Sequence, residues 1–145
     1  MTRIPPGTRA DYRAFRALPT RWMDNDEYGH MNNATYLSFM DTAVSLWQLD
    51  NGIEIRGPQA LRFLVVETGM RYHAEAGFPD LVHAGLRIGH LGQSSLRYEV
   101  GLFRNDEDSA CAEGHFAQVL TGDDHRPTPI PDPVRARLAP LLVEG

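Results

Sequence analysis

The chain has 145 residues, of which 42% are hydrophobic and 23% charged, as is ordinary for one globular domain. Its 14 basic and 19 acidic side chains give a formal net charge of -5, which argues against nucleic acid as the main partner because phosphate backbones bind basic surfaces. A single cysteine, Cys111, excludes an intrachain disulfide, and because no stretch resembles a signal-peptide core or a membrane span we expect a cytoplasmic protein without a membrane partner.

The N-terminal part of the chain is expected to form a tail and then a strand. Residues 1–10, with the run "PPGT", are expected to be loose. Between Asp11 and Trp22, aromatic and aliphatic residues recur in rough alternation, which predicts a first strand. Pro19 cannot donate to a sheet ladder, so this strand is expected at an edge or a bulge.

One long helix is predicted over "ATYLSFMDTAVSLWQLDNG". Four apolar residues fall on one helical stripe: Leu37, Met40, Val44 and Trp47. Asn32 or Asn33 is suited to cap the start of the helix, and Gly52 is suited to end it. Further apolar residues beside the stripe predict that this helix is largely buried.

The remainder of the chain is predicted to form four strands. "ALRFLVVETGMRYHA" is apolar on both faces in its middle, as in a central strand. "LVHAGLRIGH" and "SLRYEVGLF" alternate between apolar and other residues, with "LGQS" as a hairpin turn between them. "ACAEGHFAQVLT" is the last strand, and residues 122–145 form a proline-rich tail in which a short helix is expected at about residues 134–142.

This order of elements predicts a single α+β domain over residues 1–145. The most economical packing is a curved antiparallel sheet wrapped around one long central helix. Such a packing leaves one flank of the helix open, which favours covering by a second copy of the chain.

The polar stretch "DNDEYGHMNN", from Asp24 to Asn33, directly precedes the helix and has two interpretations. The residue types alone favour a capping loop that complements the helix dipole. Alternatively, free N–H groups near Asn33 polarise a carbonyl group while the carboxylate of Asp26 attacks it or activates water. That chemistry is acyl transfer or hydrolysis and needs no metal or organic cofactor. The histidines show no metal-ligand spacing.

The segment "TRWMDNDEYGHMNNATYLSFMDTA" resembles the signature of the hotdog-fold acyl-CoA thioesterases of the 4-hydroxybenzoyl-CoA thioesterase-like family. That signature has two Asp residues separated by one residue, then Gly, then His-hydrophobic-Asn-Asn, then an aromatic residue. The corresponding residues are Asp24, Asp26, Gly29, His30, Met31, Asn32, Asn33 and Tyr36. "YHAEAGFPDLVHAGLRIGHLGQSSLRYEVGLF" is similar to the family's middle strands, so the resemblance spans most of residues 12–121.

The resemblance implies the hotdog fold and a cytoplasmic acyl-CoA thioesterase. It implies a homodimer or homotetramer with active sites between subunits. It also implies that Asp26 is the catalytic nucleophile or general base, and that the N–H of Asn33 polarises the thioester carbonyl. Substrate-binding roles are implied for the loop residues Tyr28, Gly29 and His30 and for the hairpin residues Ser94 and Ser95.

Two features depart from the family pattern. One branch grips the coenzyme A phosphates with a basic cluster at the hairpin, whereas "GHLGQSS" has only His90 nearby. Binding of the phosphates is therefore weak or uses other residues, for example Arg71, Arg87 or Arg97. The choice between coenzyme A and carrier-protein thioesters stays open. The glutamate that another branch uses on the helix is also missing.

Two other functions stay open. The first is a hydratase or dehydratase acting on 3-hydroxyacyl thioesters, with His30 and Asp26 as a proton-transfer pair. The second is a non-catalytic acyl-thioester-binding protein. Loss of enoyl absorbance without free thiol would identify the first, and ligand-dependent stabilisation without turnover would identify the second.

Overall fold

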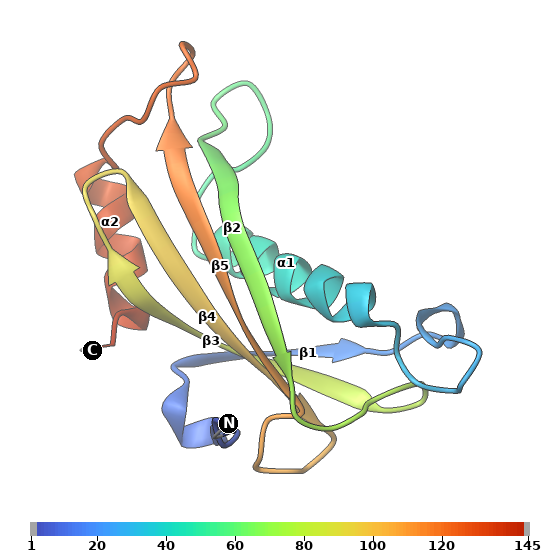
Figure 1. Ribbon diagram of the computed structural model, residues 1–145. Coiled ribbons are helices and arrows are strands. Elements are labelled where there is room, and N and C mark those ends of the chain that lie inside the picture. Colours follow the sequence, from blue (N-terminus) through green and yellow to red (C-terminus); the bar gives the residue numbers. More distant parts are fainter. Residues whose placement is uncertain (1–2, 144–145) are drawn as a thin grey trace.

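The computed structural model describes residues 3–143; the outermost residues of the two expected tails, 1–2 and 144–145, lie outside the described residues. The elements of the described chain are β1 (Ala14–Pro19), α1 (Asn33–Asp50), β2 (Arg62–Tyr72), β3 (Leu81–Leu91), β4 (Ser95–Arg104), β5 (Ala112–Thr121) and α2 (Asp132–Leu138), with three short 3₁₀ turns. All five strands form one antiparallel sheet in the order β1-β3-β4-β5-β2. The long helix α1 lies against one face and contacts every strand (Figure 1). This confirms the predicted antiparallel α+β layout.

The N-terminus of α1 is fixed by a side-chain cap. Of the two asparagines proposed from the sequence, Asn32 is the cap, and its Oδ1 accepts the N–H of Ala34 at 2.9 Å. Asn33 is therefore the first residue of the helix. At the other end Gly52 has a φ of +73°, a conformation that glycine adopts without strain and that ends the helix where the sequence predicted.

Replacement of Asn32 by Ala is expected to reduce the free energy of unfolding by about 1 kcal/mol, because the N–H of Ala34 loses its acceptor. Urea denaturation measures the difference. Asn32→Asp is the matched control, since aspartate caps equally well. If Asn32→Ala and Asn32→Asp are equally stable, the capping bond contributes nothing.

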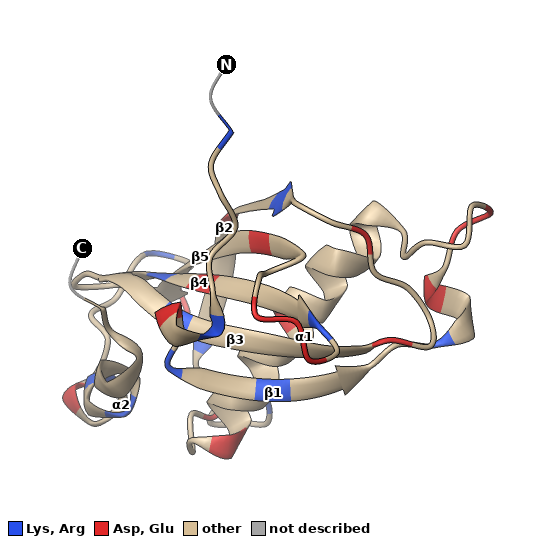
Figure 2. Ribbon diagram, turned by 90° about the horizontal axis from the view of Figure 1, so that it is seen from below, with Lys and Arg blue, Asp and Glu red and all other residues tan. Residues whose placement is uncertain are grey.

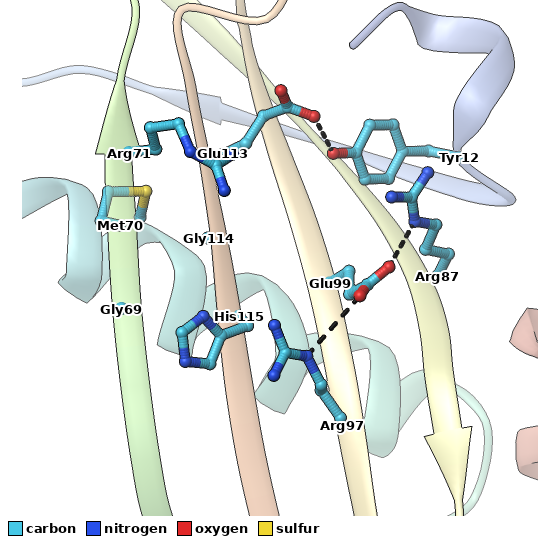
Figure 3. A pocket seen from close by; sticks show the side chains of 10 residues that line it. All are labelled: Tyr12, Gly69, Met70, Arg71, Arg87, Arg97, Glu99, Glu113, Gly114 and His115. Atoms are coloured by element: carbon cyan, nitrogen blue, oxygen red, sulfur yellow. Dashed lines mark hydrogen bonds and ion pairs between the residues drawn. The ribbon is translucent and has the colours of Figure 1, made fainter. Parts of the chain in front are cut away.

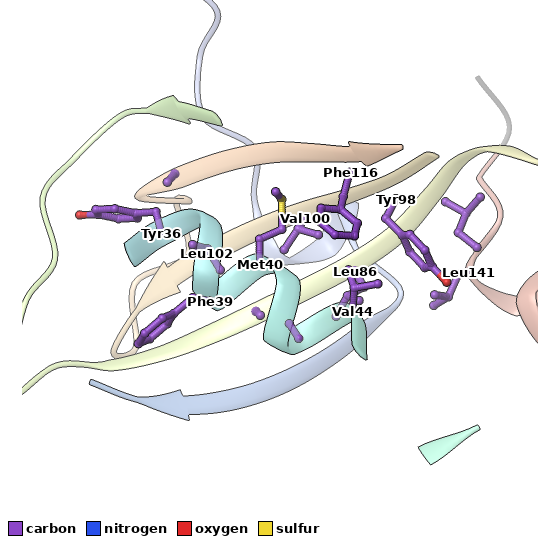
Figure 4. Close-up of a cluster of buried hydrophobic side chains, with 14 of the residues drawn as sticks. Tyr36, Phe39, Met40, Val44, Leu86, Tyr98, Val100, Leu102, Phe116 and Leu141 are labelled. Atoms are coloured by element: carbon purple, nitrogen blue, oxygen red, sulfur yellow. The ribbon is translucent and has the colours of Figure 1, made fainter. Parts of the chain in front are cut away.

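The core lies between α1 and the inner face of the sheet (Figure 4). Helix α1 buries Tyr36, Phe39, Met40, Ala43, Val44 and Gln48. The alternating residues of β3 and β4 face this stripe, and every one is at most 1% exposed: Val82, Ala84, Leu86, Ile88, Leu96, Tyr98, Val100 and Leu102. Each large apolar side chain buried in this way stabilises the fold by roughly 1.5–3 kcal/mol.

A small cluster of buried polar side chains inside this core is joined by hydrogen bonds. The side-chain NH₂ of Gln48 donates to the hydroxyl oxygen of Tyr98 and to Oε1 of Gln118, both at 3.1 Å. Because the amide satisfies two buried acceptors, this end of α1 is held in a fixed register against β4 and β5. Burial raises the pKa of the Tyr98 hydroxyl, so it stays neutral.

The prediction that β2 is a central strand is wrong. The sheet order places it at an edge, where it pairs with β5 alone. Its middle residues Leu64, Val65 and Val66 are 47%, 48% and 63% exposed, and Val66 sits at a bulge between its neighbours. Apolar residues on both faces predicted cover on both sides. In one chain the middle of β2 lacks this cover, and its apolar edge is left facing solvent.

The two tails make defined contacts within the described residues. Gly7 donates its N–H to Glu113 Oε1 at 2.8 Å and accepts the N–H of Ala110 at 3.0 Å. At the other end α2 packs beside the β3–β4 hairpin, where Arg135 donates to the carbonyl of Gly92 at 2.9 Å. Arginines and acidic residues are interspersed over strands and loops in the view of Figure 2. None of the helices in residues 3–143 has the length and apolarity needed to cross a membrane.

Candidate active site

An open cavity of about 590 Å³ lies at the N-terminus of α1. Four residues proposed from the sequence line it together: Asp26, Tyr28, His30 and Asn33. The other walls come from Met31, Tyr36, Tyr72, His73, Ala74 and Glu75. The cavity is therefore built from the polar loop, the first turn of α1 and the end of β2.

The loop before α1 orients the carboxylate of Asp26. Its Oδ1 accepts the N–H groups of Tyr28 at 2.8 Å and His30 at 3.3 Å, while its own N–H donates to the carbonyl of His30 at 2.7 Å. Gly29 has a φ of +81°, which favours glycine at the tip of this turn. Among residues 3–143 no hydrogen-bond donor contacts Oδ2 of Asp26. One oxygen is thus anchored and the other is free to react.

The backbone N–H of Asn33 is an unused donor at the start of α1. The neighbouring N–H groups of Ala34 and Thr35 donate to the side chain and carbonyl of Asn32. Within the part of the chain that the structure describes, no acceptor takes the N–H of Asn33. A free N–H at the positive end of an 18-residue helix suits a carbonyl oxygen that gains negative charge.

The loop is anchored by Asp24, which is 3% exposed. Its carboxylate accepts the backbone N–H of Arg21 at 2.7 Å and pairs with the guanidinium of that residue at 2.8 Å. Its carbonyl accepts the N–H of Asn32 at 3.0 Å. This first Asp of the motif is therefore a structural residue that fixes the loop to the helix cap.

Sequence reasoning missed Tyr72 as part of this cavity. Its hydroxyl donates to the carbonyl of Asn33 at 2.9 Å, and its ring meets the ring of Tyr36 edge to face at 5.1 Å. Tyr36 is buried, which raises the pKa of its hydroxyl, and its oxygen accepts the N–H of Ala76. Tyr72 is 39 residues away from Asn33 along the chain, so no local pattern reveals this contact.

His30 is paired with Glu75, another residue that the sequence did not indicate. Its Nε2 lies 2.9 Å from Oε2 of Glu75, and both side chains are well exposed. Its contact with the carboxylate of Asp26 runs through the backbone N–H and not through the ring. The side-chain pair that a hydratase would need is thus not formed between His30 and Asp26.

The remaining proposed residues lie outside this cavity. Gly29 lines an adjoining cavity of about 200 Å³ together with His30 and Glu75. Ser94 and Ser95 lie where the hairpin between β3 and β4 (Figure 1) enters β4, and they are not among the residues that line either cavity. Within one chain the structure does not bring these serines to Asp26. In residues 3–143 no three His, Cys, Asp or Glu side chains gather as a metal site.

The chain matches one family model and is similar to several solved structures. The model of the Thioesterase-like superfamily matches residues 20–138, a range that contains the whole cavity. The PA5185 protein from Pseudomonas aeruginosa strain PAO1 is 41% identical, with a TM-score of 0.90 over 95% of this chain and 97% of that chain. No curated protein gives a significant match.

Two further solved structures are similar at lower identity. The PA2801 protein from Pseudomonas aeruginosa is 34% identical, with a TM-score of 0.78 over 86% of this chain and 97% of that chain. A thioesterase from Thermus thermophilus, solved with coenzyme A and Zn, is 30% identical, with a TM-score of 0.71 over 90% of this chain and 94% of that chain.

Proposed function

The chain belongs to the thioesterase-like superfamily, and on this premise we propose that it hydrolyses an acyl-CoA to the free acid and coenzyme A. The observation that carries the proposal is the meeting, in one open cavity, of a free carboxylate oxygen on Asp26 and a free N–H on Asn33. The coenzyme A bound to the Thermus thermophilus relative supports coenzyme A as the leaving part of the substrate.

In the proposed mechanism the thioester carbonyl accepts the N–H of Asn33 at the start of α1. As the carbonyl is attacked, the helix dipole and this N–H stabilise the growing negative charge, an effect of roughly 2.7–4 kcal/mol for one well-placed donor. Oδ2 of Asp26 either attacks the carbonyl carbon or takes a proton from the attacking water. The thiolate of coenzyme A leaves and is protonated, and the acid takes its new oxygen, in net terms, from water.

The loop contributes to this mechanism by holding Asp26 before substrate arrives. The N–H groups of Tyr28 and His30 fix Oδ1 and thereby orient Oδ2. Because the carboxylate is already oriented, no free energy is spent on reorganising it during the reaction. The edge-to-face pair of Tyr36 and Tyr72 supplies an apolar wall for the acyl group beside Asn33.

We further propose that the functional form is a homodimer, or a tetramer of such dimers, formed through β2. The exposed edge of β2 carries Leu64, Val65 and Val66, and its backbone donors and acceptors face away from β5. Pairing with β2 of a second copy satisfies these groups and buries the apolar side chains. Because Tyr72 ends β2 and also lines the cavity, the proposed active site lies beside that interface.

Thiol release from a panel of short, medium, long-chain and aromatic acyl-CoAs tests the proposal. We expect at least one of these substrates to give steady turnover. Disappearance of an enoyl thioester without free thiol would instead support a hydratase. Stabilisation by acyl-CoA without any turnover would support a binding protein.

The protein's own thiol is not expected to disturb this assay. Cys111 is 2% exposed, and burial raises its pKa to about 11, so near pH 8 little of it is the reactive thiolate. We expect a colorimetric thiol reagent to detect no fast-reacting thiol in the native protein and one per chain after denaturation. We place the protein in the cytoplasm, where such a thiol stays reduced.

The same thiol gives a dependence of stability on pH. The unfolded thiol ionises near 9.0, whereas the folded thiol keeps its proton to about 11. Its contribution to stability is therefore complete below about pH 9 and is lost as the pH rises to about 11. Cys111→Ser should show less of this loss in urea titrations at alkaline pH. A fast reaction of the native thiol at pH 8 would contradict its burial.

A further inference from the structure

A second cavity, of about 440 Å³, lies on the outer face of the sheet, away from α1 (Figure 3). Side chains from four strands and from the N-terminal segment line it. The sheet pairing sets two of its rows, one of Gly69, His115, Glu99 and Arg87, and one of Arg71, Glu113, Gly101 and Gly85. Nothing in the proposed hydrolysis uses these residues.

Three glycines on this face leave room for aromatic rings to lie directly against the backbone. A Cβ on Gly69 would lie 2.5 Å from the ring of His115, so the ring rests against bare backbone. Cβ atoms on Gly85 and Gly101 would meet the side chain of Tyr12 at 2.9 and 2.6 Å. The cavity lies between the ring of His115 and the ring of Tyr12, and charged side chains border it.

The acidic groups of the cavity are already paired. Glu113 accepts the Tyr12 hydroxyl at 2.5 Å and the N–H of Gly7 at 2.8 Å. Glu99 accepts Nε of Arg87 at 2.7 Å, and the guanidinium of Arg87 also lies over the ring of Tyr12. These contacts occupy oxygens of both carboxylates with hydrogen-bond donors, and they use Arg87 as a structural cation paired with Glu99.

Two guanidinium groups keep free donors. Among residues 3–143 no carboxylate lies within 4.0 Å of the Arg71 guanidinium, and Arg97 has a single, loose contact with Glu99 at 3.6 Å. Arg71 extends from β2 and Arg97 from β4, both toward the strand β5 between them (Figure 3). The two residues are not level along the sheet, because Arg71 pairs with Glu113 and Arg97 pairs with Ala117, four residues further along β5. Their backbones are therefore about 13 Å apart along the strand and about 10 Å apart across it, and the two long side chains approach each other above β5 where they line one cavity with His115 (Figure 3). Two planar guanidinium groups that approach from opposite sides can each bind the oxygens of a different phosphate group of one diphosphate.

This cavity connects to the candidate active site along the end of β2. Arg71 also lines a cavity of about 660 Å³ together with Arg3, Tyr72 and His73. Tyr72 and His73 in turn line the cavity that holds Asp26. Three cavities therefore adjoin through shared residues, and a long flexible ligand can run from Asn33 across the sheet edge to Arg71.

From this arrangement we infer that the outer-face cavity binds the phosphate groups of coenzyme A through Arg71 and Arg97. The inference rests on the proposed function, because it places the nucleotide end of the substrate whose thioester lies at Asn33. The proposed phosphate site lies on the outer face of the sheet, and the β3–β4 hairpin does not contribute to it. Selection of coenzyme A over a shorter pantetheine thioester follows from these two arginines.

Equilibrium binding of coenzyme A, pantetheine and inorganic phosphate, measured by titration calorimetry, tests the site without requiring turnover. We expect Arg71→Gln and Arg97→Gln each to weaken coenzyme A binding about tenfold, as for loss of one charge-assisted hydrogen bond. Binding of pantetheine should not change. Arg56→Gln is the matched control, since Arg56 is exposed in the loop after α1 and makes no ion pair within residues 3–143. Added salt should weaken coenzyme A binding in wild type more than in the variants.

Each outcome decides the matter. If Arg71→Gln and Arg97→Gln bind coenzyme A like Arg56→Gln, or if wild type fails to bind coenzyme A, the inference is overturned. If inorganic phosphate binds as tightly as coenzyme A while pantetheine does not bind, the cavity is a general phosphate site unconnected with the substrate, and the inference is likewise overturned. If coenzyme A binds through these arginines but no acyl-CoA is hydrolysed, the proposed hydrolysis fails and the phosphate site stands.

Discussion

Replacement of Asp26 by Asn is expected to lower thiol release from the best acyl-CoA by about a thousandfold or more, with the fold unchanged. Asparagine has nearly the same shape, and its Oδ1 can still accept the N–H groups of Tyr28 and His30. The loop therefore keeps its conformation. The amide nitrogen that replaces Oδ2 neither attacks a carbonyl nor accepts a proton from water, so both versions of the mechanism lose their reactive atom.

The measurement is kcat for wild type and variant under the same conditions, with thermal unfolding of each as a check on folding. Asp41→Asn is the matched control, because Asp41 is an exposed acid on α1 whose only side-chain hydrogen bond in residues 3–143 is with Ser45. We expect Asp41→Asn to retain turnover. A folded Asp26→Asn variant with near-normal kcat would remove Asp26 from the mechanism.

The elements that sequence patterns predicted well are those in which one face is buried. In β3 and β4 the period of two separates core from solvent, so the alternation expected from the sequence agrees with the burial of Leu86 and Tyr98 on the inner face. The helix was equally clear, because Asn32 and Gly52 carry end signals that depend on backbone geometry alone. The local sequence is therefore sufficient to predict these elements.

The errors and omissions come from contacts between distant segments or between copies. The sequence predicted a central strand for β2 because Val65 and Val66 are apolar. The local pattern does not reveal whether another strand of the same chain pairs with this edge. Tyr72 and Glu75 reach the cavity only because β2 ends beside the start of α1. The motif around Asp26 was visible from spacing, whereas its partners across the sheet were not.

The second large effect is expected from Val66→Arg, which should convert the proposed dimer into monomers. Val66 is 63% exposed in one chain and lies at the bulge in the middle of the β2 edge. In a two-fold pairing of β2 with β2, both copies would bury the new charge without a partner, at a cost of about 3–5 kcal/mol. That corresponds to an increase of about a hundredfold to a few thousandfold in the dissociation constant. Sedimentation velocity over a range of concentrations measures it.

Leu142→Arg is the matched control, because Leu142 is 42% exposed and bridges to Ile88 of β3, which β4 and β5 separate from β2. It should leave assembly unchanged, whereas a Val66→Arg protein that stays dimeric would show that β2 is not the interface.

Turnover in the Val66→Arg monomer then shows whether one chain forms the whole active site or whether the second copy completes it. Asp26 and Asn33 line the same cavity within one chain, so the reacting groups survive dissociation. The cavity is open, however, and Tyr72 on its wall ends the strand that the second copy would cover. If the dimer completes the wall, turnover per chain should fall in parallel with the dimer fraction and return at high protein concentration. Full turnover in a proven monomer would mean that one chain forms the whole active site and that β2 pairing serves stability alone.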